Sequence, residues 1–495
     1  MFALLVWFFL PPEYVSLAGE VATLSDAGRA TFAVLVWMGW WWLTEAIDVP
    51  ATALLPVAIF PLLGISSFGA AAAPYADSIV FLFLGGFVLA QSMQRWGLDR
   101  RIALAVISYT GTRPAGLIFG VMLATAVLSM WVSNTATAAM MLPIAASLVD
   151  LMRRRPRDEY ETGSPDDAPA HLRNFGTAMM LGMAYAASIG GIGTIIGSPP
   201  NGIVVEYMRR NFDREIEFWR WMAIGVPIVA VFLPACWLLL LALFPCGATR
   251  LEGGADLIRR ERAALGPINR GEWTTAIVFG VVSALWIARP WLTQIEFDGM
   301  QPLRGLTDGG IALLGALSLF LLPGGRTEGP SEDRGPVPPT MDWKTAEGLP
   351  WGVLLLFGGG LSLAAALETN GVAAFLAAKF SVLSGAPTLL VVVLLALAIV
   401  VLSELASNTA IAATMMPLMA ALAPALGMSP YSLIFTAGLA ASCGFMLPVA
   451  TPPNAIVFGS GRVPLSSMYK AGSILDLMGV ALVTLAAYTV VTWLV

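Results

Sequence analysis

The chain has 495 residues, of which 57% are hydrophobic and only 12% are charged, and its net charge is −5. A soluble domain carries about a quarter charged residues, so this composition excludes an ordinary soluble protein, and the charge gives no sign of a nucleic-acid partner. Apolar runs of roughly 20 residues, the length that crosses a bilayer, recur along nearly the whole chain. We therefore expect an all-α polytopic membrane protein. The three cysteines are odd in number and lie in apolar segments, which indicates buried thiols and no disulfide framework.

The apolar segments define the expected elements in chain order. They fall near residues 3–18, 31–47, 50–65, 76–94, 114–149, 176–208, 220–246, 273–292, 306–323, 350–368, 387–425, 430–459 and 472–494. The N-terminus lacks the basic region and small-residue cleavage site of a signal peptide. Residues 1–30 are therefore expected to contain a first transmembrane helix.

Segment 114–149 is too long for one crossing and has the length of two half-helices. Arginines precede it, at positions 95, 100, 101 and 113, and the run RRRPR follows it at 153–157. The positive-inside rule puts both flanks in the cytoplasm, so the segment should enter and return as a re-entrant hairpin. Ser133-Asn134-Thr135 would lie at its tip.

Segment 387–425 is similarly long but has almost no basic flanks. It should be a second re-entrant hairpin that enters from outside, with Ser407-Asn408-Thr409 at its tip. About 11 other segments then cross, with the N-terminus in the cytoplasm and the C-terminus outside. The run RRNFDRE at 209–215 opposes this orientation, because it falls outside, although nearby acids offset its charge.

Two motif pairs indicate an internal duplication. SNTATAAMMLPIA begins at Ser133 and SNTAIAATMMPLMA at Ser407, while GSPPN spans 197–201 and ATPPN spans 450–454. We predict a first inverted repeat at 31–247, with hairpin 114–149 and broken helix 176–208. A cytoplasmic linker at 248–272 follows, and then a second inverted repeat at 273–495, with hairpin 387–425 and broken helix 430–459. Inverted repeats with broken helices are typical of secondary transporters.

The residue types in these motifs suit ion binding. Pro-Pro removes two backbone donors and disfavours helix before it, so both broken helices should unwind and expose carbonyl oxygens, which suit a small cation such as Na⁺. The helices that start after each tip direct positive dipole ends at it, which favours an anion. Neither hairpin contains Lys or Arg. The charge of the anion must therefore be met by dipoles, hydroxyls, amides and bound cations.

Other polar and small residues have simpler interpretations. The glycine pairs at Gly85 and Gly358 favour close helix packing. Glu404 is an intramembrane carboxylate and hence a functional candidate, but its counterpart in the first repeat is Met130. A structural hydrogen bond is therefore favoured for Glu404 over a proton or cation role.

With its paired Ser-Asn-Thr tips and paired Pro-Pro-Asn breaks, the chain resembles the divalent anion:sodium symporters, the INDY-type dicarboxylate, citrate and sulfate transporters. The resemblance implies a homodimer in the membrane lipid that works by an elevator mechanism. It implies substrate contacts from Ser133, Asn134, Thr135, Ser198, Ser407, Asn408, Thr409 and Thr451. It implies one Na⁺ site at Ser129, Ser133, Asn134 and Gly197, and another at Ser403, Ala406, Asn408 and Ala450.

The expected function is Na⁺-coupled import of C4-dicarboxylates such as succinate, malate or fumarate across a bacterial inner membrane. No cofactor is expected beyond Na⁺ as the coupling ion. A Na⁺-independent dicarboxylate or citrate exchanger and a sulfate carrier remain open. An ion channel is disfavoured, because two opposed hairpins suit alternating access. An enzyme is disfavoured too, because no nucleophile–base set falls at membrane depth.

Overall fold

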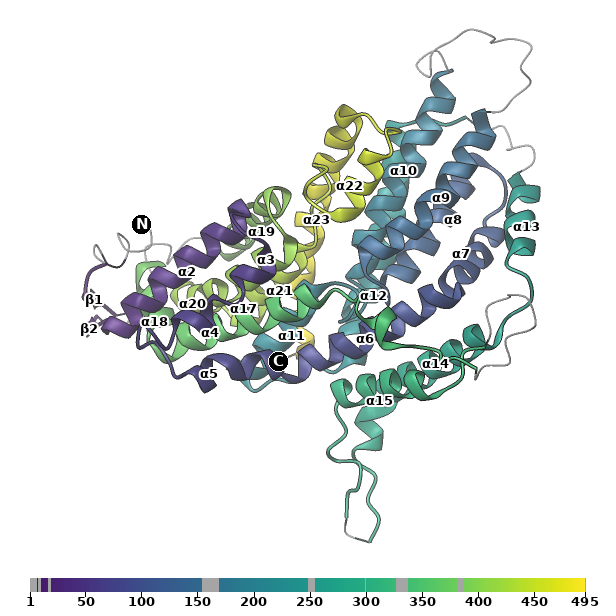
Figure 1. Ribbon diagram of the computed structural model, residues 1–495. Helices are drawn as coiled ribbons and strands as arrows, with labels where there is room; N and C mark the ends of the chain where they lie inside the picture. The colour runs from purple at the N-terminus through teal and green to yellow at the C-terminus, as the bar shows by residue number, and fades with distance from the viewer. Residues whose placement is uncertain are drawn as a thin grey trace.

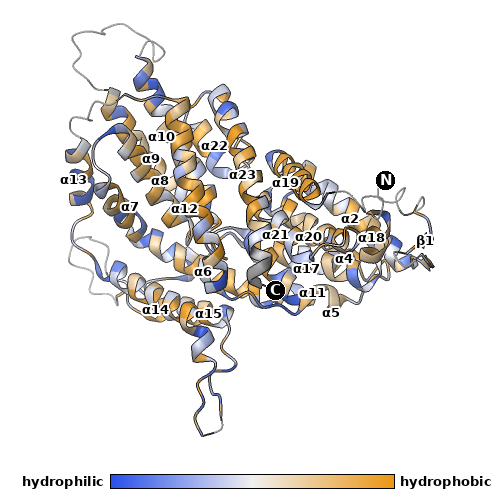
Figure 2. Cartoon of the chain, turned by 180° about the vertical axis from the view of Figure 1, so that it is seen from behind, coloured by the Kyte–Doolittle hydropathy of each residue, from blue (hydrophilic) through white to orange (hydrophobic). Residues whose placement is uncertain are grey.

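The computed structural model describes residues 7, 10–16, 19–153, 169–247, 254–298, 300–325, 337–380 and 387–494. Within these residues the protein is helical apart from one antiparallel strand pair, β1 (Glu13–Val15) with β2 (Val21–Thr23). Eight of the described helices are long and apolar enough to cross a membrane, and four shorter apolar helices accompany them. Figure 2 shows that hydrophobic residues dominate most of the helices, whereas α13 (Gly254–Ala264) is largely hydrophilic. The predicted all-α membrane fold is confirmed.

The elements of the first half follow the predicted order. They are α2 (Asp26–Thr44), α3 (Val49–Thr52), α4 (Leu55–Ile59), α5 (Phe68–Ala72), η1 (Ala73–Ala76), α6 (Ser78–Trp96), α7 (Leu98–Tyr109), α8 (Pro114–Ser129), α9 (Asn134–Arg153), α10 (Ala170–Gly191), α11 (Pro199–Phe212) and α12 (Phe218–Leu243). Helices α8 and α9 form the first hairpin. Helices α10 and α11 form the first broken helix, which is interrupted at residues 192–198.

The second half repeats this plan after α13. Its elements are α14 (Arg270–Leu292), α15 (Asp308–Leu321), α16 (Trp343–Ala346), α17 (Trp351–Thr369), α18 (Val372–Phe380), α19 (Thr388–Leu405), α20 (Asn408–Ala425), α21 (Pro430–Ala441), α22 (Pro452–Gly459) and α23 (Leu465–Leu494). Helices α19 and α20 form the second hairpin. Helices α21 and α22 form the second broken helix.

The second helix of each broken pair packs against the other half of the chain. Helix α11 packs against α20 and α21 of the second half, and α22 packs reciprocally against α9 and α10 of the first half. Figure 1 shows α22 beside α10 and α9, away from α18 and α20. Each half therefore completes the other, as expected of two repeats of one unit. The predicted limits of the repeats stay predictions.

The structure differs from the prediction at two places near the N-terminus. Glu13–Val15 is a strand, so the apolar segment 3–18 does not continue as a helix to its end. Pro11 and Pro12 precede this strand and cannot supply the backbone donors that a helix needs. Most of the predicted helix in 1–30 lies outside the described residues. The segment 50–65 forms two short helices, each with a proline in its first turn, Pro50 and Pro56.

Close helix packing explains the glycine pairs. A Cβ atom on Gly85 of α6 would lie 2.5 Å from the carbonyl carbon of Ala312 in α15, and a Cβ on Gly358 of α17 would lie 2.2 Å from the ring of Tyr75. Helices α6 and α15 make one of the most extensive contacts in the molecule. The packing interpretation of Gly85 and Gly358 is confirmed.

Candidate functional site

One cavity of about 880 Å³ gathers both hairpin tips and both helix breaks. It is lined by all eight residues predicted to contact substrate, namely Ser133, Asn134, Thr135, Ser198, Ser407, Asn408, Thr409 and Thr451. Gly197 and Ala450, predicted to contribute carbonyl oxygens to the cation sites, line it too. Residues from distant parts of the sequence thus meet at one place. The roles assigned to them stay predictions.

Four helix N-termini converge on this cavity. Helices α9 and α20 begin at the hairpin tips, at Asn134 and Asn408, and α11 and α22 begin at the breaks, at Pro199 and Pro452. The first residues of each helix are among the cavity lining. Helix N-termini carry partial positive charge and unpaired backbone N–H groups. The cavity therefore favours an anion.

The cavity wall offers no basic side chain to that anion. Among the described residues that line it there is no Lys or Arg, and Glu45 carries the only charge. Three further polar or aromatic side chains come from α6, namely Phe87, Gln91 and Gln94. This contribution of α6 was not predicted, because nothing in the Ser-Asn-Thr and Pro-Pro-Asn motifs points to it.

Oxygen atoms gather beside the first tip. Ser129 is fully buried, and its Oγ lies 2.6 Å from Asn134 Oδ1 and donates to Ala187 O at 2.7 Å. Asn134 Oδ1 also faces the carbonyl oxygens of Ala187 and Gly197. If the side-chain amide is flipped, so that its oxygen and nitrogen exchange places, Nδ2 lies 3.1 Å from Ala187 O and 3.3 Å from Gly197 O. Clustered oxygen acceptors are what a hard cation binds. The turned amide would satisfy this group by ordinary hydrogen bonds, and in either orientation the oxygens of Ser129, Ala187 and Gly197 lie together as a Na⁺ site requires.

The second tip has the same construction. The fully buried Ser403 donates from Oγ to Ala441 O at 3.2 Å, and Ala406 and Ala450 are also buried. Asn408 Oδ1 is buried with no hydrogen-bond partner in the described structure. An acceptor buried without a partner costs about 1–3 kcal/mol. A Na⁺ ion at this place would satisfy it.

A glycine lies behind each tip at equivalent places, Gly191 and Gly444. The position of a Cβ on Gly191 is 2.7 Å from Asn134 Oδ1 and 3.1 Å from Gly197 O. The position of a Cβ on Gly444 is 3.3 Å from Ala450 Cβ and 3.7 Å from Asn408 Oδ1. Each glycine thus leaves room in the predicted cation site. Neither glycine was predicted from the sequence, although both stand ten residues before the Asn of a Pro-Pro-Asn motif.

The Asn of each Pro-Pro-Asn motif holds its break in shape. Asn201 donates from Nδ2 to Gly191 O and Thr194 O, both at 2.8 Å. Asn454 repeats this with Gly444 O at 3.4 Å and Leu447 O at 3.0 Å. Both asparagines are fully buried. The carbonyls that the prolines free are therefore held in place by a duplicated amide brace.

Glu404 is a further brace that only the second break has. Its carboxylate oxygens accept from the backbone N–H groups of Met446 and Leu447 at 2.8 and 2.7 Å. Asp476 of α23 accepts from Phe445 N beside it at 3.1 Å. In the first half Thr194 contributes instead, since its hydroxyl accepts from Gly197 N at 3.1 Å and donates to Met130 O. These contacts bear out the structural interpretation of Glu404.

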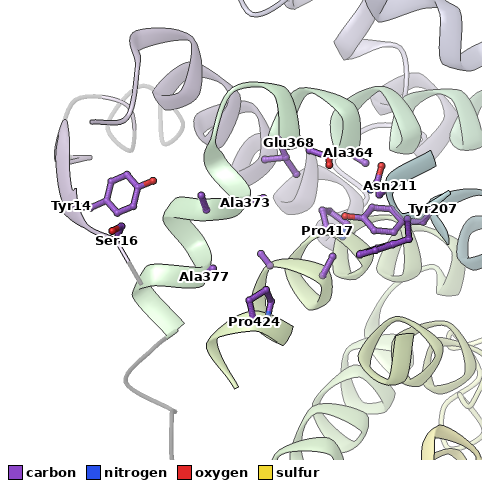
Figure 3. Close-up of a pocket in the computed structure, with 15 residues that line it drawn as sticks. Tyr14, Ser16, Tyr207, Asn211, Ala364, Glu368, Ala373, Ala377, Pro417 and Pro424 are labelled. Carbon is purple, nitrogen blue, oxygen red and sulfur yellow. The ribbon is translucent and has the colours of Figure 1, made fainter. Parts of the chain in front are cut away.

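A second cavity, of about 440 Å³, lies at the other end of α11 (Figure 3). Tyr14, Tyr207 and Glu368 line it, with small residues of α18 and α20. None of the predicted site residues is part of its lining. The predicted anion-site residues therefore belong to the larger cavity alone, among the described residues.

Comparison with known proteins agrees with this geometry. The model of the sodium:sulfate symporter transmembrane region matches residues 2–495. The chain belongs to the sodium:sulfate symporter family. This confirms the resemblance to divalent anion:sodium symporters, and the chain is an integral membrane protein of a transporter family.

Curated members of this family match along most of their length. The sodium-dependent dicarboxylate transporter SdcS of Staphylococcus saprophyticus is 38% identical over 469 residues, covering 94% of this chain and 87% of the relative. SdcS of Staphylococcus aureus is 35% identical over 491 residues, covering 99% and 89%. Among solved structures, the YdaH transporter of Alcanivorax borkumensis shares the fold of this symporter-family chain, with a TM-score of 0.55, 14% identity and coverage of 98% and 94%.

Proposed function

We propose that the protein carries a small dicarboxylate dianion across the membrane together with Na⁺. The convergence of both Ser-Asn-Thr tips and four helix N-termini on one cavity without a basic side chain carries the proposal. Relatives at 38% and 35% identity are named sodium-dependent dicarboxylate transporters, which supports this substrate class and coupling ion. A C4 chain such as succinate, malate or fumarate is the proposed cargo.

In the proposed complex, the hydroxyls and amides of the two tips contact the carboxylates. Ser198 and Thr451 lie alongside them as the N-caps of α11 and α22. One Na⁺ binds among Ser129, Ser133, Asn134 and Gly197. The other binds among Ser403, Ala406, Asn408 and Ala450. Each ion attracts the dianion far more strongly in a protein interior than in water, so anion and cation binding strengthen each other by equal factors.

Alternating access is proposed to follow an elevator mechanism in a homodimer. The hairpins and broken helices, α8–α12 with α19–α23, would form the moving part, and α2–α6 with α13–α17 the frame. The packing of α11 against α20 and α21, and of α22 against α9 and α10, supports this division. These contacts connect the hairpin of each half to the broken helix of the other.

The test is uptake of labelled succinate into liposomes that contain the purified protein. We expect saturable uptake with an inward Na⁺ gradient and almost none when choline replaces Na⁺. Uptake that needs internal dicarboxylate but no Na⁺ would establish the exchanger instead. Competition by sulfate at concentrations where malate does not compete would establish a sulfate carrier, the alternative that the family's name favours. Conversion of succinate would indicate an enzyme, and current without saturable counterflow a channel.

A further inference from the structure

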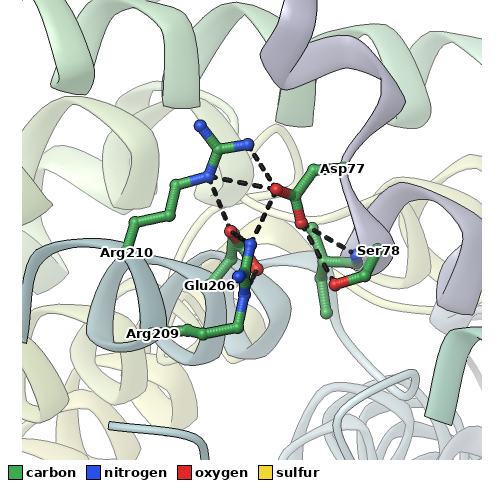
Figure 4. A network of polar contacts seen from close by, with 6 residues as sticks. Asp77, Ser78, Glu206, Arg209 and Arg210 are labelled. Carbon is green, nitrogen blue, oxygen red and sulfur yellow. Dashed lines mark hydrogen bonds and ion pairs between the residues drawn. The ribbon is translucent and has the colours of Figure 1, made fainter. Parts of the chain in front are cut away.

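A compact ion cluster joins the C-terminal end of α11 to the N-terminal end of α6 (Figure 4). Arg209 and Arg210 of α11 both bind Asp77, the N-cap residue of α6, with Arg209 Nη2 2.8 Å and Arg210 Nε 3.1 Å from Asp77 Oδ2. Both arginines also bind Glu206 of α11, at 2.6 and 2.7 Å. The side chains of Asp77 and Glu206 are only 7% and 2% exposed. Two buried carboxylates are thus neutralised by two arginines whose side chains are 41% and 26% exposed.

The cluster explains the exception to the positive-inside rule. Arg209 and Arg210 begin the run RRNFDRE, whose basic residues fall on the predicted outer side. The structure pairs both with carboxylates, one from their own helix and one from α6. Their charge is therefore balanced locally. The sequence shows Glu206 nearby, but it could not show that Asp77 reaches the same place.

Helix α11 connects this cluster to the anion cavity. Its N-cap Ser198 lines the cavity, and its C-terminal arginines bind Asp77. Helix α6 also lines the cavity, with Gln94 in the cavity wall near its C-terminus and Asp77 as its N-cap residue. At about 1.5 Å per residue, the two ends of α6 are about 25 Å apart. The cavity wall therefore lies near the C-terminal end of α6, and the ion cluster lies at its N-terminal end.

The equivalent arginine of the second half makes a different contact. Arg462 follows α22 as Arg209 ends α11, and it binds Asp150 of α9 at 2.6 and 3.1 Å. Helices α9 and α22 belong to the same proposed moving part. The Asp77 contact, in contrast, joins the moving part to the frame. Only the Asp77 contact must therefore change when one part moves past the other.

We propose that Asp77 is a positioning residue that locks α11 to α6 through Arg209 and Arg210 in the state of the present structure, whose cavity lining includes the exposed Glu45, and releases it in the opposite state. The inference rests on the proposed alternating-access function. Glu206 lies on α11 itself, so both arginines keep one carboxylate when Asp77 is withdrawn. The released state therefore leaves no arginine without a carboxylate, which makes the lock reversible.

The test measures from which face the cavity can be reached. In protein whose three cysteines are replaced by serine, Ala139→Cys places a thiol on an exposed cavity residue that has no proposed ligand role. An impermeant maleimide is applied to intact cells and to inside-out vesicles, without substrate. We expect the parent to react mainly from the face of Glu45. Asp77→Asn, which keeps a side chain that caps helices well but loses its charge, should shift the ratio of the two rates at least threefold toward the other face.

Asp150→Asn is the matched control, because it weakens the equivalent arginine pair without touching α6. Its labelling ratio should stay within 1.5-fold of the parent ratio, a factor that corresponds to about 0.2 kcal/mol. Arg210→Gln breaks the same lock from the other side and must shift the ratio in the same direction, which keeps the test valid if Asp77→Asn folds poorly. An unchanged ratio in both lock variants would overturn the proposal, as would an equal shift in Asp150→Asn. Because no substrate is present, the result is independent of which dianion is carried.

Discussion

Gly191 and Gly444 determine how much room each predicted cation site has. They occupy equivalent places in the two halves, but the clearances around them differ. A methyl group on Gly191 would stand 2.7 Å from Asn134 Oδ1, whereas one on Gly444 would meet Ala450 Cβ at 3.3 Å as its nearest neighbour. The first distance is too short for any carbon–oxygen contact, and the second requires a shift of only a few tenths of an ångström. The two sites should therefore respond unequally to the same substitution.

We expect Gly191→Ala to lower the apparent Na⁺ affinity of succinate uptake at least tenfold, because the new methyl group displaces Asn134 Oδ1 from the oxygen cluster. A tenfold change corresponds to about 1.4 kcal/mol. Gly444→Ala should change this affinity less than about threefold. The measurement is initial uptake into liposomes across a Na⁺ series at constant ionic strength. Equal effects of the two substitutions would contradict the predicted difference in clearance between the two sites.

Much of the site follows from residues whose chemistry lies in their side chains. Ser133, Asn134 and their counterparts were predictable because hydroxyls and amides stand out in an apolar chain and recur at matching positions. The carbonyls of Ala187 and Ala441 were not, because every residue carries a carbonyl and only the fold decides which ones converge. The contact between Asp77 and Arg210 could not be predicted either, since no spacing rule relates residues so far apart in sequence.

At the scale of elements, helices α6 and α15 approach so closely that their contact leaves no room for a side chain at Gly85. The Cβ position of Gly85 lies 2.5–2.7 Å from the backbone and Cβ of Ala312. Backbone atoms within a helix cannot rotate away as a side chain can. Helix α6 also carries Gln91 and Gln94 of the cavity wall. Packing at this point therefore positions part of the site.

Gly85→Ala should destabilise the protein by about 1–3 kcal/mol through overpacking. Gly280→Ala in α14 is the control, because nothing lies within 4 Å of its Cβ position. Alanine there should be neutral or stabilising by about 0.5–1 kcal/mol, as expected for replacing glycine within a helix. Thermal unfolding in one detergent measures both. A melting temperature for Gly85→Ala at or above the parent value would contradict the close-contact interpretation.

Long apolar elements were predictable and short or amphipathic ones were not. The hairpins 114–149 and 387–425 match α8–α9 and α19–α20 within a few residues, because apolar length constrains both and basic flanks constrain the first. Helices α7 and α18 were missed. Each is shorter than a membrane crossing, and α7 begins with the charged run Asp99-Arg100-Arg101, so a search for crossings passes over both. The division of 50–65 into α3 and α4 was missed because hydropathy does not register a change of direction.

At the scale of the whole molecule, the anion cavity exists only where the two halves meet. Each half contributes one tip and one break, and each broken helix packs on the hairpin of the other half. Neither half could enclose a dianion alone. An upside-down arrangement of the second half is what lets four helix N-termini point at one place, because equivalent helices then approach the centre from opposite faces. The inverted orientation is thus linked directly to the chemistry of the site.

This orientation can be tested with two single cysteines in protein whose native cysteines are replaced. His171 at the start of α10 and Met300, between α14 and α15, are both exposed. An odd number of crossings separates them, formed by α10–α11, α12 and α14, so the two positions should face opposite sides of the membrane. The arginine run at 153–157 places the first on the cytoplasmic side. We expect an impermeant thiol reagent to label Met300→Cys in intact cells and His171→Cys only in inside-out vesicles. If both thiols react from the same side, the inverted-repeat topology is wrong, and the convergence of helix ends on the cavity would need another explanation.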